Sequence, residues 1–175
     1  MSPSRGFAPV VGGTPRVLVL GSLPGAASLA AGQYYAHPRN AFWMIMGEIA
    51  GAAPALPYAE RCARLVACGI ALWDVCAAAR RPGSLDSAIE PASVEPNDFA
   101  GLLAAHPCIG HVAFNGAKAA ELYRRLVQPS LAGAPGRLPQ IVLPSTSPAH
   151  AGRSFASKLE AWCAALACAG VSPLS

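Results

Sequence analysis

Four short apolar runs alternate with longer amphipathic segments along the chain. Each run ends in a turn that is rich in polar residues or glycine. A continuous apolar run of this kind is typical of a strand that is buried on both faces of a parallel sheet. The pattern predicts strands at about 16–21, 70–73, 109–114 and 140–143.

Segments with helical spacing of apolar residues follow these runs. Pro38 precedes one such segment, Gly69 ends another, and Asn97 or Asp98 can cap a third. Strands that alternate with helices imply right-handed crossovers and helices on both faces of the sheet. We therefore expect an α/β fold, a three-layer α/β/α sandwich with a central, mostly parallel four-stranded sheet. The expected helices cover about 39–51, 58–68, 99–106, 117–126 and 154–169.

Length and composition favour one folded domain. Residues 1–15 contain three prolines and no periodicity, so we interpret them as an N-terminal arm, and residues 16–175 as a single domain. The chain is 53% hydrophobic and 13% charged, which suits a large core rather than disorder. No apolar run is long enough to cross a bilayer, and the arm lacks the apolar core of a signal peptide. We expect a soluble, cytoplasmic protein.

Charge and cysteine spacing narrow the function only slightly. The formal net charge of +4 suits an anionic partner but does not separate nucleic-acid binders from other enzymes. The six cysteines form no Cys-x-x-Cys pair, so their spacing indicates neither a zinc site nor an iron–sulfur cluster. We expect small buried thiols, no disulfide and no metal.

All four predicted strands end in turns that carry chemically useful groups. These turns are 21–25, Asp74, 115–116 and 144–150. Two tyrosines, a histidine, an arginine and an asparagine follow the first turn, at positions 34–40. Because the carboxyl ends of parallel strands meet along one edge of the sheet, the sequence predicts a single active cleft there.

Four motifs in these turns resemble the uracil-DNA glycosylase superfamily. They are Gly-Ser-Leu-Pro-Gly at 21–25, Tyr-Ala-His-Pro-Arg-Asn-Ala-Phe-Trp at 35–43, Phe-Asn-Gly at 114–116 and Leu-Pro-Ser-Thr-Ser-Pro-Ala-His at 143–150. The likeness covers about residues 16–165 and is strongest to family six, the hypoxanthine-DNA (deoxyinosine) glycosylases. It implies a monofunctional DNA repair enzyme that flips out a deaminated base, preferably hypoxanthine, and hydrolyses its N-glycosidic bond to leave an abasic site.

Departures from other branches of the superfamily single out Asn40. Leu23 stands where the mismatch-specific branch carries its catalytic asparagine, and the first loop holds neither Asp nor Glu. The late loop begins Leu-Pro-Ser rather than His-Pro-Ser. The resemblance to family six implies that Asn40 is catalytic. An amide cannot remove a proton at neutral pH, so Asn40 would orient the attacking water. Asn40 could equally serve as a helix N-cap, and the two roles are compatible.

The resemblance also implies a set of base-binding residues. Tyr35 or Phe42 would stack on the extruded base, although Phe42 could instead belong to the core. Asn115 would read the Watson–Crick edge, because its amide both donates and accepts; the alternative is a turn role. The first loop would approach the nucleotide with its backbone. The full set is Gly21, Ser22, Leu23, Tyr35, Phe42 and Asn115.

The remaining candidates would contact the DNA. Hydroxyl and N–H groups at 145–147 suit phosphates, and 148–150 correspond to the position where the superfamily inserts a wedge. Ala149 is small for this role, which makes His150 a candidate. Lys118, Arg153 and Lys158 could also touch the backbone or lie solvated on the surface. The predicted DNA-binding set is His37, Arg39, Ser145, Thr146, Ser147, Pro148, Ala149 and His150.

The resemblance requires no cofactor, and the expected partner of this monomer is DNA that contains a deaminated base. The only lysines, Lys118 and Lys158, fall on predicted helices away from the strand-end loops, so we expect no Schiff-base lysine. Asp74 is expected to order the cleft through hydrogen bonds. Two alternatives remain: a uracil- or xanthine-directed glycosylase on the same scaffold, and a nucleic-acid-binding module that has lost catalysis.

Overall fold

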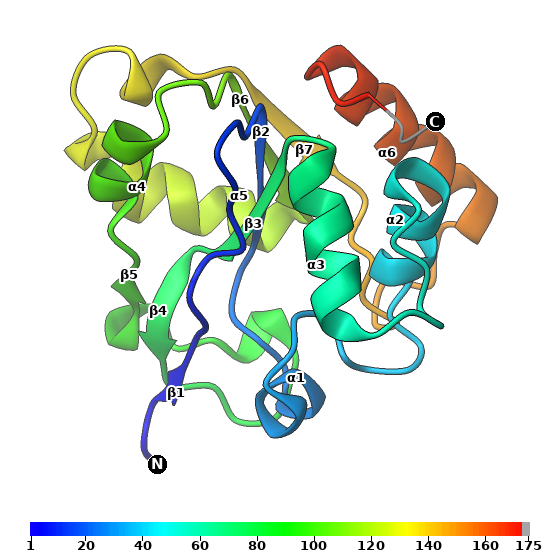
Figure 1. Cartoon of the computed structure of the whole chain (residues 1–175). Helices are drawn as coiled ribbons and strands as arrows, with labels where there is room; N and C mark the ends of the chain where they lie inside the picture. The colour runs from blue at the N-terminus through cyan, green and yellow to red at the C-terminus, as the bar shows by residue number, and fades with distance from the viewer. Residues whose placement is uncertain (173–175) are drawn as a thin grey trace.

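Four parallel strands form the centre of the computed structural model, which describes residues 1–172 (Figure 1). The sheet has the order β3-β2-β6-β7. Every residue of β2 and β3 is buried, as expected of strands that are covered on both faces. The predicted fold class is confirmed. The strands are β2 (Val17–Gly21), β3 (Ile70–Asp74), β6 (His111–Asn115) and β7 (Gln140–Leu143).

Helices cover both faces of this sheet. In Figure 1, α2, α3 and α6 lie on one side, and α4 and α5 lie on the other. The five predicted helices are present, although α5 gives way at Tyr123 to a wider π-helical turn. The short helix α1 was not predicted. The helices are α1 (Ala26–Ala31), α2 (Phe42–Ala50), α3 (Tyr58–Ala67), α4 (Phe99–Ala105), α5 (Ala117–Leu122) and α6 (Phe155–Cys168).

Alternating side chains of β2 divide the core in two. Val17 and Val19 pack with residues of α2, α3 and α6, whereas Leu18 and Leu20 pack with residues of α4 and α5. Successive side chains of a strand point to opposite faces, so one short strand organises both layers. The strand ends are thereby fixed between two packed cores, which gives the loops that follow them a rigid base.

A second, antiparallel sheet was not predicted. It consists of β1 (Ser4–Arg5), β4 (Cys76–Ala79) and β5 (Glu95–Pro96), in the order β1-β4-β5. Two of these strands have only two residues and the third is rich in alanine, so no alternation of apolar and polar positions marks them.

The N-terminal arm packs along this side of the molecule. Besides the pairing of β1 with β4, Val10 forms an antiparallel bridge with Leu72 and so covers the edge of β3. The Trp73 indole donates a hydrogen bond to the carbonyl of Phe7 at 3.0 Å. The described part of the chain holds no helix with the length and apolar character needed to cross a membrane.

Candidate active site

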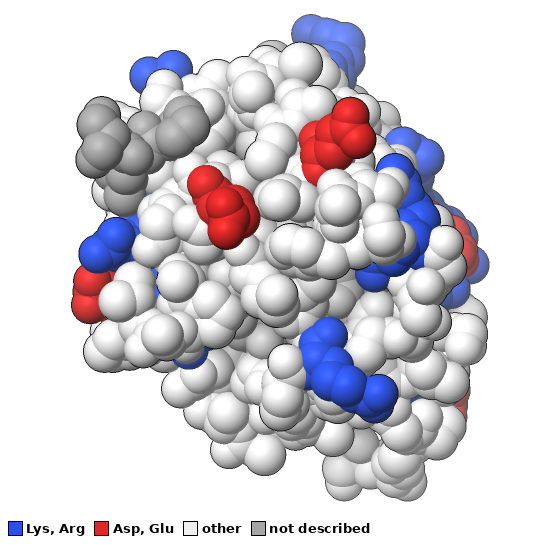
Figure 2. All heavy atoms as spheres, turned by 90° about the vertical axis from the view of Figure 1, so that its right-hand side faces the viewer, with Lys and Arg blue, Asp and Glu red and all other residues white. Residues whose placement is uncertain are grey.

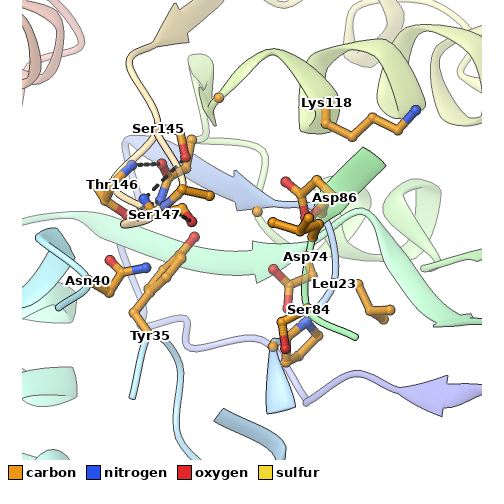
Figure 3. Close-up of a pocket in the computed structure, with 18 of the residues that line it drawn as sticks. Leu23, Tyr35, Asn40, Asp74, Ser84, Asp86, Lys118, Ser145, Thr146 and Ser147 are labelled. Carbon is orange, nitrogen blue, oxygen red and sulfur yellow. Dashed lines mark hydrogen bonds between the residues drawn. The ribbon is translucent and has the colours of Figure 1, made fainter. Parts of the chain in front are cut away.

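A cleft of about 570 Å³ lies at the carboxyl ends of the central strands (Figure 3). Its walls come from segments at the ends of all four strands: the first loop (residues 21–25) at the end of β2, Asp74 at the end of β3, residues 115–118 at the end of β6, and residues 145–147, 149 and 150 after β7. Arg81 and residues 84–87, from the loop after β4, form a further part of the wall. The lining also includes Ser28, Tyr34, Tyr35, His37, Asn40 and Glu121. The predicted convergence of the strand ends is confirmed.

Thr146 joins three of the segments that form the cleft. Its hydroxyl accepts a hydrogen bond from Asn115 Nδ2 and its backbone N–H donates to Asn115 Oδ1, both at 2.9 Å. Its carbonyl oxygen accepts from the N–H of Ala41 at 3.0 Å. The side chain is 1% exposed, so water cannot compete for these bonds. Thr146 therefore fixes the late loop (residues 145–150) against β6 and the start of α2.

Asn40 lies at the start of α2, on the wall of the cleft. Its Oδ1 accepts a hydrogen bond from the N–H of Phe42 at 3.0 Å, which closes an Asx turn just before the helix. The N-cap of α2 is Ala41, so the alternative of Asn40 as the N-cap is wrong. The bond to Phe42 also determines which side-chain atom is the oxygen. The amide nitrogen consequently points toward the side of the cleft where Tyr35 lies (Figure 3), and it can offer N–H donors to a ligand.

Tyr35 enters the cleft from a strained backbone. Its φ is +53°, and it is the one non-glycine residue with a positive φ among residues 1–172. Such a conformation costs about 1–2 kcal/mol. Its ring stacks on Phe42, with centroids 4.1 Å apart and planes at 28°. Its hydroxyl is buried and has no hydrogen-bond partner among the described residues.

Phe42 supports Tyr35 from behind and does not reach the cleft. Its side chain is fully buried, packed against Tyr35, Trp43 and Trp162. Contact of Phe42 with an extruded base, one of the two roles considered for it, is therefore not available. The helical pattern did not determine whether Phe42 faces the core or the cleft. The packing of α2 against α6 turns its side chain into the core.

The absence of a side chain at Gly21 lets two other side chains approach each other at the floor of the cleft. A Cβ atom at this position would collide with Asp74 Oδ1 and would lie 2.9 Å from the Tyr35 hydroxyl. The absence of a side chain, rather than an unusual φ, is what this site requires. Gly21 therefore permits Asp74 and Tyr35 to approach the same point of the chain.

Asp74 is a buried carboxyl group at the end of β3. Its side chain is 3% exposed, and its Oδ2 has no hydrogen-bond partner among the described residues. Burial, helped by the nearby Asp86, raises the pKa of Asp74 to about 7, and Arg81 opposes the shift. The expectation that hydrogen bonds of Asp74 order the cleft holds only for its backbone, whose carbonyl accepts from Asn97 Nδ2 at 2.8 Å.

Arg81 and Asp86 hold the first loop in place, a role that the sequence did not reveal. The buried Arg81 guanidinium donates to the carbonyl oxygens of Leu23, at 3.1 Å, and Pro24. Asp86 Oδ1 accepts from the Ser22 hydroxyl at 2.6 Å and lies 3.7 Å from Arg81. Residues 80–87 are polar enough to predict a solvated loop, and the pattern carries no signal that this arginine turns inward.

Most of the predicted site residues meet in the cleft. Arg39, Phe42 and Pro148 do not line it. Thr146 lines it, but its buried hydroxyl is bound to Asn115, which leaves it unsuited to a phosphate contact. The residues brought together are Gly21, Ser22, Leu23, Tyr35, His37, Asn40, Asn115, Ser145, Thr146, Ser147, Ala149 and His150.

Both lysines lie closer to the strand-end loops than expected. Lys118 lines the cleft, because α5 begins directly after β6, and its ammonium group is 3.0 Å from the Glu121 carboxylate. Lys158 is buried in the first turns of α6 and donates to the carbonyl of His150 at 2.8 Å. The expectation that these residues lie away from the loops is therefore wrong.

Charged residues outside the cleft do not form a continuous field on the side drawn in Figure 2. That side, formed by α2, α3 and α6, shows basic and acidic residues scattered over a mainly uncharged surface. Among residues 1–172 no group of three His, Cys, Asp or Glu side chains is placed to bind a metal ion.

Comparisons with known proteins agree with this geometry. The family model described as the uracil DNA glycosylase superfamily matches residues 9–166. Two curated relatives are each named hypoxanthine DNA glycosylase. The protein from Methanosarcina barkeri is 39% identical over 118 residues, 67% of this chain and 73% of that protein. The protein from Methanosarcina acetivorans is 38% identical over 139 residues, 74% of this chain and 87% of that protein.

A solved structure resembles the whole fold. It is the solution NMR structure of a candidate uracil DNA glycosylase from Methanosarcina acetivorans, with a TM-score of 0.73 and 33% identity over 93% of this chain and 98% of that chain. The chain belongs to the uracil DNA glycosylase superfamily. The resemblance seen in the four motifs is thereby confirmed, and with it the expectation of a DNA glycosylase, whose substrate is DNA.

The close approach at Gly21 yields a prediction about stability. Gly21→Ala should destabilise the protein by about 1–3 kcal/mol, because the added methyl group must displace the buried Asp74 or Tyr35. Gly25→Ala is the matched control in the same loop: its Cβ would lie 3.8 Å from Ser84, an ordinary contact. Urea unfolding measures both variants. Equal stability of the two would contradict the packing described at Gly21.

The raised pKa of Asp74 yields a prediction about pH. Between about pH 4 and about pH 7 the folded protein keeps a proton on Asp74 that the unfolded chain has released, so wild-type stability falls across this range as pH rises. Asp74→Asn removes this dependence. The advantage of the variant in free energy of unfolding should grow to a few kcal/mol by about pH 7 and then level off. Urea unfolding at several pH values tests this. If the free energies of unfolding of Asp74→Asn and wild type differ by the same amount from pH 4 to 8, Asp74 is not buried as a neutral acid.

Proposed function

We propose that this protein is a monofunctional DNA glycosylase that removes hypoxanthine from DNA and leaves an abasic site. The observation that carries the proposal is Asn40, held on the wall of a cleft formed by all four strand ends, with its oxygen bound to the N–H of Phe42 and its amide N–H groups left for a ligand. The two relatives named hypoxanthine DNA glycosylase support the choice of base. The similar solved structure, described as that of a candidate uracil DNA glycosylase, makes uracil the second base to test.

In the proposed mechanism the target base leaves the duplex and enters the cleft. The Asn40 amide donates a hydrogen bond to a water molecule and holds it against C1′ of the sugar. The bond between C1′ and the base breaks and the base takes the electron pair. The water oxygen then bonds to C1′, and one water proton ends on the released base. Because an amide accepts no proton, the reaction depends on the departure of the base rather than on a strong general base.

The other cleft residues have proposed roles as DNA contacts. His37, Ser145 and Ser147 lie on the rim, where they would bind backbone phosphates, and His150 would fill the space that the base leaves. Lys118 would contribute a phosphate contact rather than a Schiff base, since its ammonium group is paired with Glu121. Every group invoked lies on one chain, so we propose that the protein acts as a monomer.

Substitutions at Asn40 separate its two roles. We expect Asn40→Ala to lower the rate of hypoxanthine release about 100-fold or more, by analogy with the loss of one positioned donor. The variant also loses the hydrogen bond to the N–H of Phe42, which should destabilise the protein by about 1 kcal/mol. Asn40→Ser keeps an oxygen that can accept from this N–H but loses the amide donors, so its stability should be near that of wild type while base release stays low. The assay uses a duplex with one hypoxanthine and alkaline cleavage at abasic sites.

Asp98→Ala is a matched control, because Asp98 caps α4 by accepting from the N–H of Gly101 at 2.9 Å and does not line the cleft. It should lose a similar stability and keep base release. Full activity of Asn40→Ser would show that Asn40 serves only to bind the N–H of Phe42 at the start of α2. If wild type binds the duplex in a salt-sensitive way but releases no base, the proposal is wrong and the protein is a nucleic-acid-binding module.

A further inference from the structure

Three buried polar atoms of residues that line the cleft lack a hydrogen-bond partner within the described chain: Asp74 Oδ2, the Tyr35 hydroxyl and Arg81 Nε. The other two nitrogens of the Arg81 guanidinium bind the carbonyls of Leu23 and Pro24, so the two groups with no bond of their own are Asp74 Oδ2 and the Tyr35 hydroxyl. Both are buried, and leaving such a group unpaired costs about 1–3 kcal/mol. Most buried polar groups in proteins are hydrogen-bonded, so two exceptions in one cleft require an explanation. A ligand that supplies the missing partners would provide it.

The two groups lie on either side of the same position at the cleft floor although they come from distant parts of the sequence. Asp74 ends β3, and Tyr35 lies between α1 and α2. Both side chains crowd the same open position at Gly21, where a Cβ atom would collide with Asp74 and come within 2.9 Å of Tyr35. Figure 3 shows the Tyr35 hydroxyl and the Asp74 carboxyl on opposite sides of the cleft floor. One planar ligand can therefore contact both.

Their chemical characters are complementary. Burial and the neighbouring carboxyl group of Asp74 raise the pKa of Tyr35 far above the physiological range, so its hydroxyl stays protonated and can donate. The Asp74 carboxyl offers oxygen atoms that accept. Of the neighbouring polar side chains, Asn115 bonds to Thr146, and Asp86 bonds to Ser22 and pairs with Arg81. Tyr35 and Asp74 therefore present a ligand with one donor and one acceptor at the floor of the cleft.

We propose that Tyr35 and Asp74 together read the edge of the extruded base that deamination creates. The Tyr35 hydroxyl donates to the exocyclic carbonyl oxygen, and Asp74 accepts a hydrogen bond from the adjacent ring N–H. This inference rests on the proposed function and names the residues that select the substrate. It assigns Asp74 a direct contact with the base and gives Tyr35 a polar role in place of stacking.

The chemistry of deamination explains the selectivity. Adenine presents an amino donor beside an unprotonated ring nitrogen, whereas hypoxanthine presents a carbonyl oxygen beside an N–H group, which is the reverse order. The donor–acceptor pair therefore matches hypoxanthine and opposes adenine, and an unpaired polar group in the mismatched complex is costly. Uracil and xanthine carry the same edge. Guanine shares it as well and differs from hypoxanthine at C2, so this pair separates hypoxanthine from adenine and not from guanine.

The packing around the pair holds it in position. Phe42 stacks beneath the Tyr35 ring and fixes the strained backbone at that residue. Asp74 is fixed by its place at the end of a buried strand, paired in register with Gly21. Strained and unsatisfied groups persist only where the surrounding structure enforces them, and they concentrate at functional sites. The stability lost at this floor is therefore consistent with a binding role.

The test compares two purines that differ only at this edge. Duplexes carry one hypoxanthine or one unsubstituted purine, which lacks the carbonyl oxygen and the ring N–H. The quantity measured is the ratio of kcat/KM for hypoxanthine to that for purine. Intrinsic differences between the two leaving groups cancel when this ratio is compared between enzyme variants. A purely structural defect slows both reactions and leaves the ratio unchanged.

We expect Asp74→Ala to lower the ratio about 10- to 100-fold, because the ring N–H of the bound base is then buried without a partner, and Tyr35→Phe to lower it about 2- to 10-fold. Asp74→Asn keeps the shape and one accepting oxygen, so it should fold even if Asp74→Ala does not, and should lower the ratio about 5-fold. Asp98→Asn is the matched control, a change of the same kind at a carboxyl group that does not line the cleft and caps α4. Its ratio should equal that of wild type.

The outcomes distinguish this inference from the proposed function. If wild type releases hypoxanthine and the ratio in Asp74→Asn and Tyr35→Phe stays within twofold of wild type, the inference is overturned and the proposed function stands. If wild type releases neither purine, both are overturned. A ratio that falls in the Asp74 and Tyr35 variants but not in Asp98→Asn supports the edge-reading pair.

Discussion

The buried hydrogen bonds of Thr146 are the constraint on which the cleft depends. Three parts of the chain that are far apart in sequence, the end of β6, the late loop and the start of α2, meet at this one residue. Because the residue is almost fully buried, losing any of these bonds would leave an unpaired polar group inside the protein. These bonds, together with the one that Asn40 Oδ1 accepts from the N–H of Phe42, fix the position of Asn40 relative to the other walls. A second set of contacts, made by Arg81 and Asp86, holds the first loop and so fixes the opposite wall.

The residues at the floor between these two walls lower the stability of the folded protein. Tyr35 has a strained backbone, and Asp74 is a desolvated carboxyl group with an unpaired oxygen beside a second carboxyl group. Such features are maintained by the two packed cores on either side of the sheet. The same rigidity gives an enzyme a preorganised site, in which groups need not be rearranged during the reaction. The fold thus concentrates its unfavourable groups where a base would bind.

The sequence predicts the scaffold well and the details of the site only in part. The four strands and five of the helices follow from apolar runs and capping residues, and the meeting of strand ends follows from parallel topology. The pattern could not reveal α1 or the small sheet, whose strands are too short or too uniform to show a period. It also could not show that Arg81 turns inward, that Phe42 packs behind Tyr35, or that the Thr146 hydroxyl is consumed by Asn115. Those outcomes depend on tertiary packing, and a residue type alone does not report its burial.

The most direct test of the account identifies the base that the protein releases. Duplexes of one sequence, each with a single hypoxanthine, xanthine, uracil or adenine, are mixed in equal amounts with wild-type protein, and the free bases are quantified by mass spectrometry. The account predicts that hypoxanthine is the main product and that adenine is not released. Release of adenine as readily as hypoxanthine, or of no base at all, would contradict it. Predominant release of uracil would keep the class of enzyme and contradict the proposed substrate.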